Sequence, residues 1–323
     1  MDEFLDKSVC VDSRYPEEWI ASDIEAFNPD APKTGEGLSR CQDGRLFRDI
    51  LKDDPNGLLG TRCASLDGGK LSILVKLLDA AERLVIQCHP TVAFAKERFH
   101  SPFGKTECWY MLRTEEDAYI HLGFCEGITR EKWVSLFEKQ DIQGMLACLH
   151  RFPVRAGELW FVNGGVPHAI GGGCLMIELQ EPSDLMVIPE RKTPAGIVLD
   201  EKKLHGGLGF EEMFDCFVYE GLSAEETRAR YCRTVEPITG KLVPVVDETL
   251  TDKFSLQLLR TDGKSHTTLG DRYAIGVVTE GSGTLRTADE SLTLAKGESF
   301  FVGANSGELT FEGDLNVVLC ISH

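Results

Sequence analysis

The chain has 323 residues, of which 42% are hydrophobic and 27% are charged, so it has the balance of a globular protein with ample core material. Its net charge of −18 excludes binding to nucleic acid or to an anionic membrane through a broad basic surface. An anionic ligand must therefore meet a local pocket of cationic side chains.

The chain begins with an acidic segment that lacks the basic and apolar regions of a signal sequence. No apolar stretch approaches the roughly 18 residues of a spanning helix. We therefore expect a cytoplasmic protein. The 11 cysteines are odd in number and show no paired spacing such as C-x-x-C, which is typical of reduced, mostly buried thiols.

Residues 1–65 are polar, with helical apolar spacing only near Leu46–Leu51, and predict an N-terminal addition of helices and loops. Beyond residue 65, short runs rich in β-forming residues predict strands. These runs are Leu71–Leu78, Arg83–Gln87, Glu107–Leu112, Ala118–Leu122, Glu158–Val162 and Cys174–Leu179. Thr129 can cap a helix that places Trp133 and Phe137 on one face, so we expect a helical insertion at about 123–150.

A short motif occurs twice. Gly157–Val162 reads Gly-Glu-Leu-Trp-Phe-Val, and Gly297–Val302 reads Gly-Glu-Ser-Phe-Phe-Val. Many short strands in two copies predict a mainly β protein of two jelly-roll β-barrels rather than a βαβ fold. We expect the first barrel at residues 66–190, a connecting segment at 191–250, and the second barrel at 251–323.

Three local patterns contain residues suited to chemistry. Gln87 and His89 are two residues apart at the end of an expected strand, so their side chains lie on one face. Lys105 and Glu107 have the same spacing before the next strand, and His168 follows a glycine-rich turn. Two imidazoles, one carboxylate and one amide oxygen suit Zn²⁺ or a similar divalent ion, with a position left for water or substrate.

The chain resembles the type I mannose-6-phosphate isomerases of the cupin superfamily, particularly their short bacterial form. The resemblance rests on motifs that occur in the family's order within residues 58–191. They are Leu58–Gly60, Leu74–Ala80, Gln87–Pro90, Gly104–Tyr110, Pro167–Ile170 and Glu178–Asp184. It implies two cupin-type barrels and a zinc-dependent enzyme that interconverts mannose 6-phosphate and fructose 6-phosphate through an enediol.

The resemblance also implies roles for particular residues. The zinc ligands fall on His89, Glu107 and His168, with Gln87 as a fourth ligand in some members, and the catalytic arginine falls on Arg191.

Other polar residues are candidates for proton transfer or for binding the substrate. Lys105 is the candidate for acid–base chemistry or for phosphate contact. The cations Lys76, Lys192 and Arg191 are candidates for holding the phosphate. Glu178 is a candidate for binding the substrate. Its carboxylate can alternatively orient a ligand histidine.

Two segments depart from the family's pattern. Leu185–Arg191 replaces a stretch that is usually aromatic, contains arginine and ends in Asp-x-x-Arg; only the arginine is retained, which leaves the preferred sugar phosphate open. The second copy has Asn305–Glu308 where the first has Gly165–His168, so we expect it to bind no metal.

The expected partners are one zinc ion and a small sugar phosphate, with no nucleic acid and no membrane, and the oligomeric state stays open. Three alternatives remain at this point. They are a cupin oxygenase with the same ligands, an isomerase of different specificity, and a non-catalytic sugar-phosphate-binding cupin.

Overall fold

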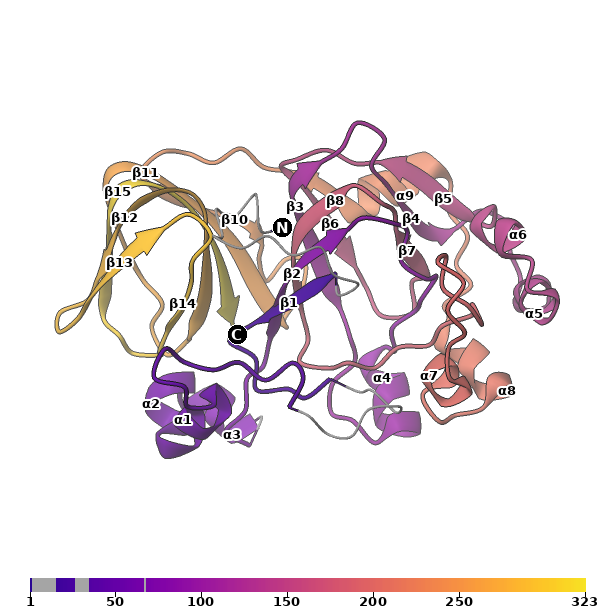
Figure 1. Ribbon diagram of the computed structural model, residues 1–323, viewed down its shortest axis with the longest axis horizontal. Helices are drawn as coiled ribbons and strands as arrows, with labels where there is room; N and C mark the ends of the chain where they lie inside the picture. The colour runs from indigo at the N-terminus through magenta and orange to yellow at the C-terminus, as the bar shows by residue number, and fades with distance from the viewer. Residues whose placement is uncertain (2–15, 27–34, 67) are drawn as a thin grey trace. The chain divides into compact units, whose positions relative to one another are not determined.

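The computed structural model describes residues 1, 16–26, 35–66 and 68–323 (Figure 1). The N-terminal addition predicted for residues 1–65 therefore lies partly outside the described residues. Among the described residues, no helix combines the length and the apolar character that crossing a membrane requires.

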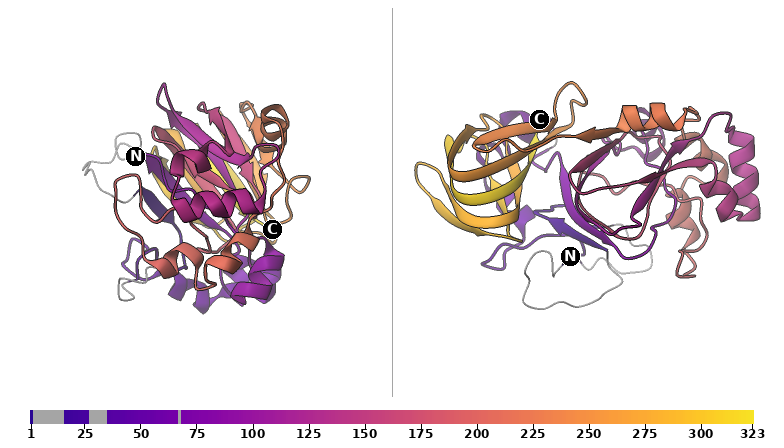
Figure 2. Two further views of the ribbon diagram at one scale, coloured as in Figure 1. Left: turned by 90° about the vertical axis from the view of Figure 1, so that its right-hand side faces the viewer. Right: turned by 90° about the horizontal axis from the view of Figure 1, so that it is seen from above.

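The chain packs as two units. One consists of Met1–Glu25, Gly35–Leu77 and Thr234–His323, and the other of Ala26–Thr34 and Leu78–Arg233. In each unit the strands curve around an interior of their own (Figure 2). Both units are mainly β and contain the sheets expected of cupins, which confirms the predicted fold class. The domain boundaries after residues 65, 190 and 250 stay a prediction.

The unit that contains the C-terminus, here the C-terminal unit, is built on a large antiparallel sheet with the order β10-β11-β15-β12-β13, and β14 also pairs with β12. Its elements are β1 (Glu17–Ile20), α1 (Phe47–Asp53), α2 (Pro55–Leu59), α3 (Thr61–Leu66), β10 (Lys241–Val246), β11 (Phe254–Thr268), β12 (Ala274–Arg286), β13 (Ser291–Ala295), β14 (Ser299–Val302) and β15 (Glu308–Ser322). β2 (Leu74–Ala80) begins in this unit and ends in the other.

The short helices of the C-terminal unit are tied to its strands by hydrogen bonds. The Asp271 carboxylate accepts from the backbone N–H and the hydroxyl of Thr61, at the start of α3, and from Asn305 Nδ2 at 3.1 Å. The backbone N–H of Ala304 donates to Leu58 O at 2.9 Å. These contacts fix the N-terminal helices to the turn that follows β14.

The second unit, here the metal unit, contains two sheets with the orders β2-β8-β3-β6-β9 and β5-β4-β7. Its strands are β3 (Glu107–Thr114), β4 (Tyr119–Phe124), β5 (Leu149–Pro153), β6 (Glu158–Val162), β7 (His168–Ile170), β8 (Cys174–Gln180) and β9 (Cys232–Thr234). Its helices are α4 (Val92–Phe94), η1 (Ala95–Phe99), α5 (Arg130–Lys139), α6 (Ile142–Leu146), α7 (Glu201–His205), α8 (Phe210–Met213), η2 (Phe214–Cys216) and α9 (Ala224–Tyr231).

Alternation along the strands separates two apolar clusters in the metal unit. Ile120 and Leu122 of β4 pack with Trp109 and Trp160 in one core. A second core, which includes Trp133 of α5, forms where the helices pack. Thr129 caps α5 by accepting from Lys132 N, so this helix begins where the sequence predicts.

The repeated motif occupies equivalent places in the two units. β3 pairs with both β6 and β8, and β12 pairs in the same way with both β14 and β15. Gly157 and Gly297, which precede β6 and β14, both have φ of 84°, a conformation that glycine adopts without steric cost. The two units therefore share one local architecture, as the repeat predicts.

One predicted strand differs from the structure. Arg83–Gln87 was expected to be a strand, but the segment forms isolated bridges, with Gln87 opposite His168 and Cys88 opposite Val187. The bridge still places Gln87 beside His168, the first residue of β7.

Candidate metal centre

Backbone pairing in the metal unit brings two of the candidate residues, Gln87 and His168, to one face, and Glu107 comes from the other sheet of this unit. Gln87 and His168 exchange two backbone hydrogen bonds of 2.9 Å, so they lie directly opposite each other and their side chains share a face. The alternation predicted for Gln87 and His89 adds His89 to the same side. Glu107 opens β3, which pairs with β6 and β8.

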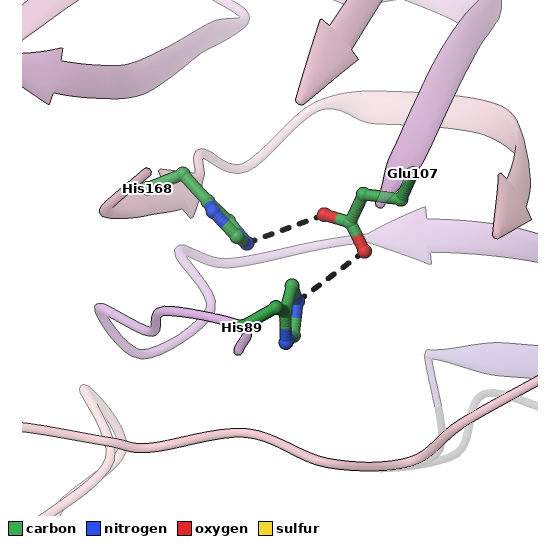
Figure 3. A group of neighbouring side chains, drawn as sticks. All are labelled: His89, Glu107 and His168. Atoms are coloured by element: carbon green, nitrogen blue, oxygen red, sulfur yellow. Dashed lines mark ion pairs between the residues drawn. The ribbon is translucent and has the colours of Figure 1, made fainter. Parts of the chain in front are cut away.

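His89, Glu107 and His168 converge in the interior of the metal unit (Figure 3). Glu107 Oε2 lies 3.2 Å from His89 Nε2, and Glu107 Oε1 lies 3.3 Å from His168 Nε2. All three side chains are buried, with at most 1% of each exposed. The structure therefore brings together the three residues predicted as metal ligands.

Backbone carbonyls set the orientation of both imidazoles. His89 Nδ1 lies 3.0 Å from Leu185 O, and His168 Nδ1 lies 3.0 Å from Val166 O. A carbonyl oxygen can only accept, so each Nδ1 carries the proton and each Nε2 keeps a lone pair. This arrangement is typical of histidines that bind a metal through Nε2.

The cluster contains acceptor atoms without hydrogen-bond donors. Within the described part of the chain, Glu107 Oε1 and His168 Nε2 are buried and make no hydrogen bond, and Glu107 Oε2 has the Lys105 ammonium at 3.3 Å. Buried acceptors of this kind are costly unless a ligand satisfies them. Two nitrogen donors and one carboxylate suit Zn²⁺ or a related divalent ion, so the residues present fit a metal.

The electrostatics favour the protonation states that metal binding requires. Burial, together with the Lys105 ammonium and against the effect of Glu107, lowers the pKa of His89 from 6.5 to about 4. Burial also lowers the pKa of His168. Burial raises the pKa of Glu107, but Lys105 and the imidazoles outweigh it and hold that pKa well below 4.5. At neutral pH the centre therefore presents neutral imidazoles and an ionised carboxylate.

Lys105 lies at the edge of this centre. Its Nζ is 3.1 Å from His89 Nε2 and 3.3 Å from Glu107 Oε2, and 2% of its side chain is exposed. The ammonium can therefore donate to both groups and can reach a molecule bound beside them.

Other polar side chains on the same face belong to β3 and β8. Glu178 and Gln180 of β8 lie opposite Trp109 and Glu107 of β3, respectively, and all four are buried. Glu178 thus lies opposite Trp109, whose ring centroid is 5.2 Å from that of His168. The sequence analysis missed Gln180, although its spacing of two from Glu178 was a usable signal.

The other predicted cations make contacts of their own. The Arg191 guanidinium lies over the rings of Phe137, at 4.9 Å, and Phe210, at 4.5 Å. Lys76 is buried in the C-terminal unit and pairs with Glu17 at 3.2 Å. Lys192 is exposed in a hairpin opposite Val198. The roles assigned to these three cations stay predictions.

We expect the chelator-treated protein to lose stability as the pH falls from about 6.5 toward 4. Burial lowers the pKa of both His89 and His121 from 6.5 to about 4. The unfolded chain protonates these imidazoles near pH 6.5 and therefore binds more protons than the folded chain in this window. Each imidazole contributes a slope of up to about 1.4 kcal/mol per pH unit.

Urea unfolding at a series of pH values, followed by tryptophan fluorescence, measures this slope. The His121→Gln variant removes one titrating imidazole and should give a shallower slope. A free energy of unfolding that stays constant between about pH 6.5 and 4.5 would contradict the expectation.

Two family models match the chain. The model described as "Phosphomannose isomerase type I, catalytic domain" matches residues 31–121, which include Gln87, His89, Lys105 and Glu107. The model described as "Mannose-6-phosphate isomerase, cupin domain" matches residues 248–322 of the C-terminal unit. His168 lies outside both matched ranges.

Individual proteins are similar over most of the chain. The probable mannose-6-phosphate isomerase GmuF of Bacillus subtilis (strain 168) is 28% identical over 280 residues, which are 87% of this chain and 82% of the relative. The mannose-6-phosphate isomerase ManA of the same organism is 35% identical over 119 residues, 37% of this chain and 36% of the relative.

Solved structures share the fold. The mannose 6-phosphate isomerase from Bacillus subtilis superposes with a TM-score of 0.66 at 22% identity, covering 86% of this chain and 82% of that chain. A zinc-bound mannose 6-phosphate isomerase superposes with a TM-score of 0.65 at 19% identity, covering 86% and 85%. The two family models and the curated relatives agree with the resemblance found in the sequence, and the chain is an enzyme of the type I mannose-6-phosphate isomerase family.

Proposed function

We propose that this enzyme uses one zinc ion to interconvert mannose 6-phosphate and fructose 6-phosphate through an enediol. The observation that carries the proposal is the buried centre of His89, Glu107 and His168, with the Lys105 ammonium 3.1 Å from His89 Nε2. The names of the relatives and of the zinc-bound structure support the substrate and the metal.

The proposed ligands are His89, Glu107 and His168, with the amide of Gln87 on the same face as a fourth. When bound, zinc supplies a Lewis acid that polarises a substrate oxygen and a positive charge that offsets the developing negative charge. The carbonyls of Leu185 and Val166 keep the two imidazoles aimed at the centre.

The isomerisation moves two hydrogens. One proton leaves the hydroxyl-bearing carbon beside the aldehyde, and a proton is added to the former aldehyde carbon. The hydroxyl proton of the carbon beside the aldehyde moves to the aldehyde oxygen, so the atoms balance without an oxidant. We assign the transfer between oxygens to Lys105, whose Nζ lies at the edge of the metal centre.

The burial of the site supports this chemistry. Lys105 and Glu107 are almost completely enclosed, and electrostatic interactions in such an environment are stronger than in water. Glu178, buried opposite Trp109, is the proposed carboxylate that contacts the substrate or orients a ligand. We assign the phosphate to the predicted cations of the metal unit, Arg191 and Lys192, and the Arg191 guanidinium lies over the rings of Phe137 and Phe210.

We expect the purified protein to convert mannose 6-phosphate to fructose 6-phosphate, to lose this activity on chelation, and to regain it with zinc. His168→Ala should abolish the zinc-restored turnover, because it removes a nitrogen ligand from the centre. A coupled assay for fructose 6-phosphate measures the rate.

His266→Ala is the matched control, since this histidine lies on β11 of the C-terminal unit with 54% of its side chain exposed. No turnover by folded, zinc-loaded protein would contradict the proposed function. Substrate binding without turnover would then identify a sugar-phosphate-binding cupin.

A further inference from the structure

A loop of residues 181–185 follows β8 and contacts two parts of the metal centre. Glu181 N donates to Thr106 O at 3.0 Å, and Thr106 N donates to the Glu181 carboxylate at 2.9 Å. Thr106 directly precedes β3 and its ligand. At the other end of the loop, Leu185 O faces His89 Nδ1 at 3.0 Å. The shape of this loop therefore affects the positions of two metal ligands.

The side-chain amide of Gln180 holds this loop from inside the metal unit. Gln180 Nε2 donates to Glu181 O at 3.1 Å and to Ser183 O at 2.7 Å, and the residue is fully buried. Both partners are carbonyl oxygens that can only accept, so the orientation of the amide is fixed by chemistry. Its two N–H groups face the loop.

The backbone register connects the same residue to the carboxylate ligand. Gln180 lies directly opposite Glu107 in the β3–β8 pair, so the two side chains share a face. Gln180 Oε1 is buried and makes no hydrogen bond to any described residue. A leucine or methionine would fill the same space without leaving a buried acceptor unpaired. The hydrogen bonds from the amide N–H groups to Glu181 O and Ser183 O therefore explain why an amide occupies this position.

We propose that Gln180 is a positioning residue for the metal centre, which orients His89 by holding Leu185 O in place through the loop of residues 181–185. If the loop relaxes, His89 Nδ1 loses its acceptor and the proton can shift to Nε2, the atom that must bind the metal. This inference rests on the metal site of the proposed function and adds a residue outside the predicted ligand set.

The test uses Gln180→Met, which preserves the volume of the side chain and removes both N–H donors. Zinc affinity is measured by competition with a chromophoric chelator, and the geometry of the centre by the visible absorption of the cobalt(II)-substituted protein. We expect zinc to bind about 10- to 100-fold more weakly and the cobalt spectrum to change. With saturating zinc, KM for mannose 6-phosphate should stay within about twofold.

Gln257→Met is the matched control, because Gln257 lies on β11 of the C-terminal unit and is partly buried. Zinc affinity and a cobalt spectrum equal to those of the unmutated protein would overturn the inference. A raised KM with unchanged zinc affinity would also overturn it, because Gln180 would then contact the sugar instead.

A milder variant covers the possibility that Gln180→Met does not fold. Ser183→Ala removes the hydroxyl that accepts from Leu185 N at 3.2 Å, so it should weaken zinc binding in the same direction by a smaller factor. Zinc affinity unchanged in this variant would overturn the inference. Both metal measurements are independent of turnover, so an unmutated protein that binds zinc but does not isomerise the sugar would contradict only the proposed function.

Discussion

Glu107→Gln is expected to lower zinc affinity and isomerase activity by at least about 100-fold each. The substitution keeps the size of the side chain but removes the anionic group of the proposed ligand, whose two oxygens lie 3.2 Å and 3.3 Å from the imidazole nitrogens. It also leaves the buried Lys105 ammonium without its carboxylate partner. Bound zinc after dialysis and the turnover rate measure the two effects.

Glu280→Gln is the matched control for this substitution. Glu280 lies on β12, the counterpart of β3 in the C-terminal unit, and 54% of its side chain is exposed. Circular dichroism must show that both variants are folded. A folded Glu107→Gln protein that keeps stoichiometric zinc and most of its activity would exclude Glu107 as a ligand.

Lys105→Met is expected to lower kcat by about 100- to 10,000-fold while zinc binding is retained or strengthened. The two effects have different causes. The substitution removes the candidate proton-transfer group, and it also removes a positive charge that lies 3.1 Å from a metal ligand and would repel a cation. The combination distinguishes a catalytic lysine from one that only supports the ligands.

Lys264→Met is the matched control, with 59% of the lysine side chain exposed on β11. Steady-state kinetics at saturating zinc and chelator competition measure the two quantities. Loss of zinc together with activity would mean that Lys105 stabilises the metal centre, and full activity would exclude a role in proton transfer.

The proposed ligand set was predictable because each member has a local signal. Gln87 and His89 have strand spacing, Glu107 opens a strand after Lys105, and His168 follows a glycine-rich turn. The spacing of Gln87 and His89 remained informative although no regular strand forms there, since Gln87 makes only an isolated bridge with His168. Backbone pairing brings Gln87 and His168 together, whereas Glu107 reaches the cluster from the other sheet of the metal unit.

Other features of the site depend on contacts between residues far apart in the chain. The position of Arg191 is set by Phe137 and Phe210, which lie on α5 and α8. The sequence shows the arginine but not these rings as its neighbours. The spacing of Gln180 from Glu178 indicates its face of the strand but not its role, because its donors meet backbone carbonyls, which every residue provides. These backbone partners can be identified only when the conformation of the loop of residues 181–185 is known.

The turn after β14 has a consequence for how the protein can be divided. Asn305 and Gly165 stand at corresponding places in the two copies and both have positive φ, 59° and 87°. The asparagine also carries an amide, which donates to Asp271, and Asp271 holds Thr61 at the start of α3. The C-terminal cupin repeat thus depends on a segment that begins at Thr61, 210 residues before Asp271. It is not an interchangeable module, and a fragment that starts at residue 248 would lack part of its own folding unit.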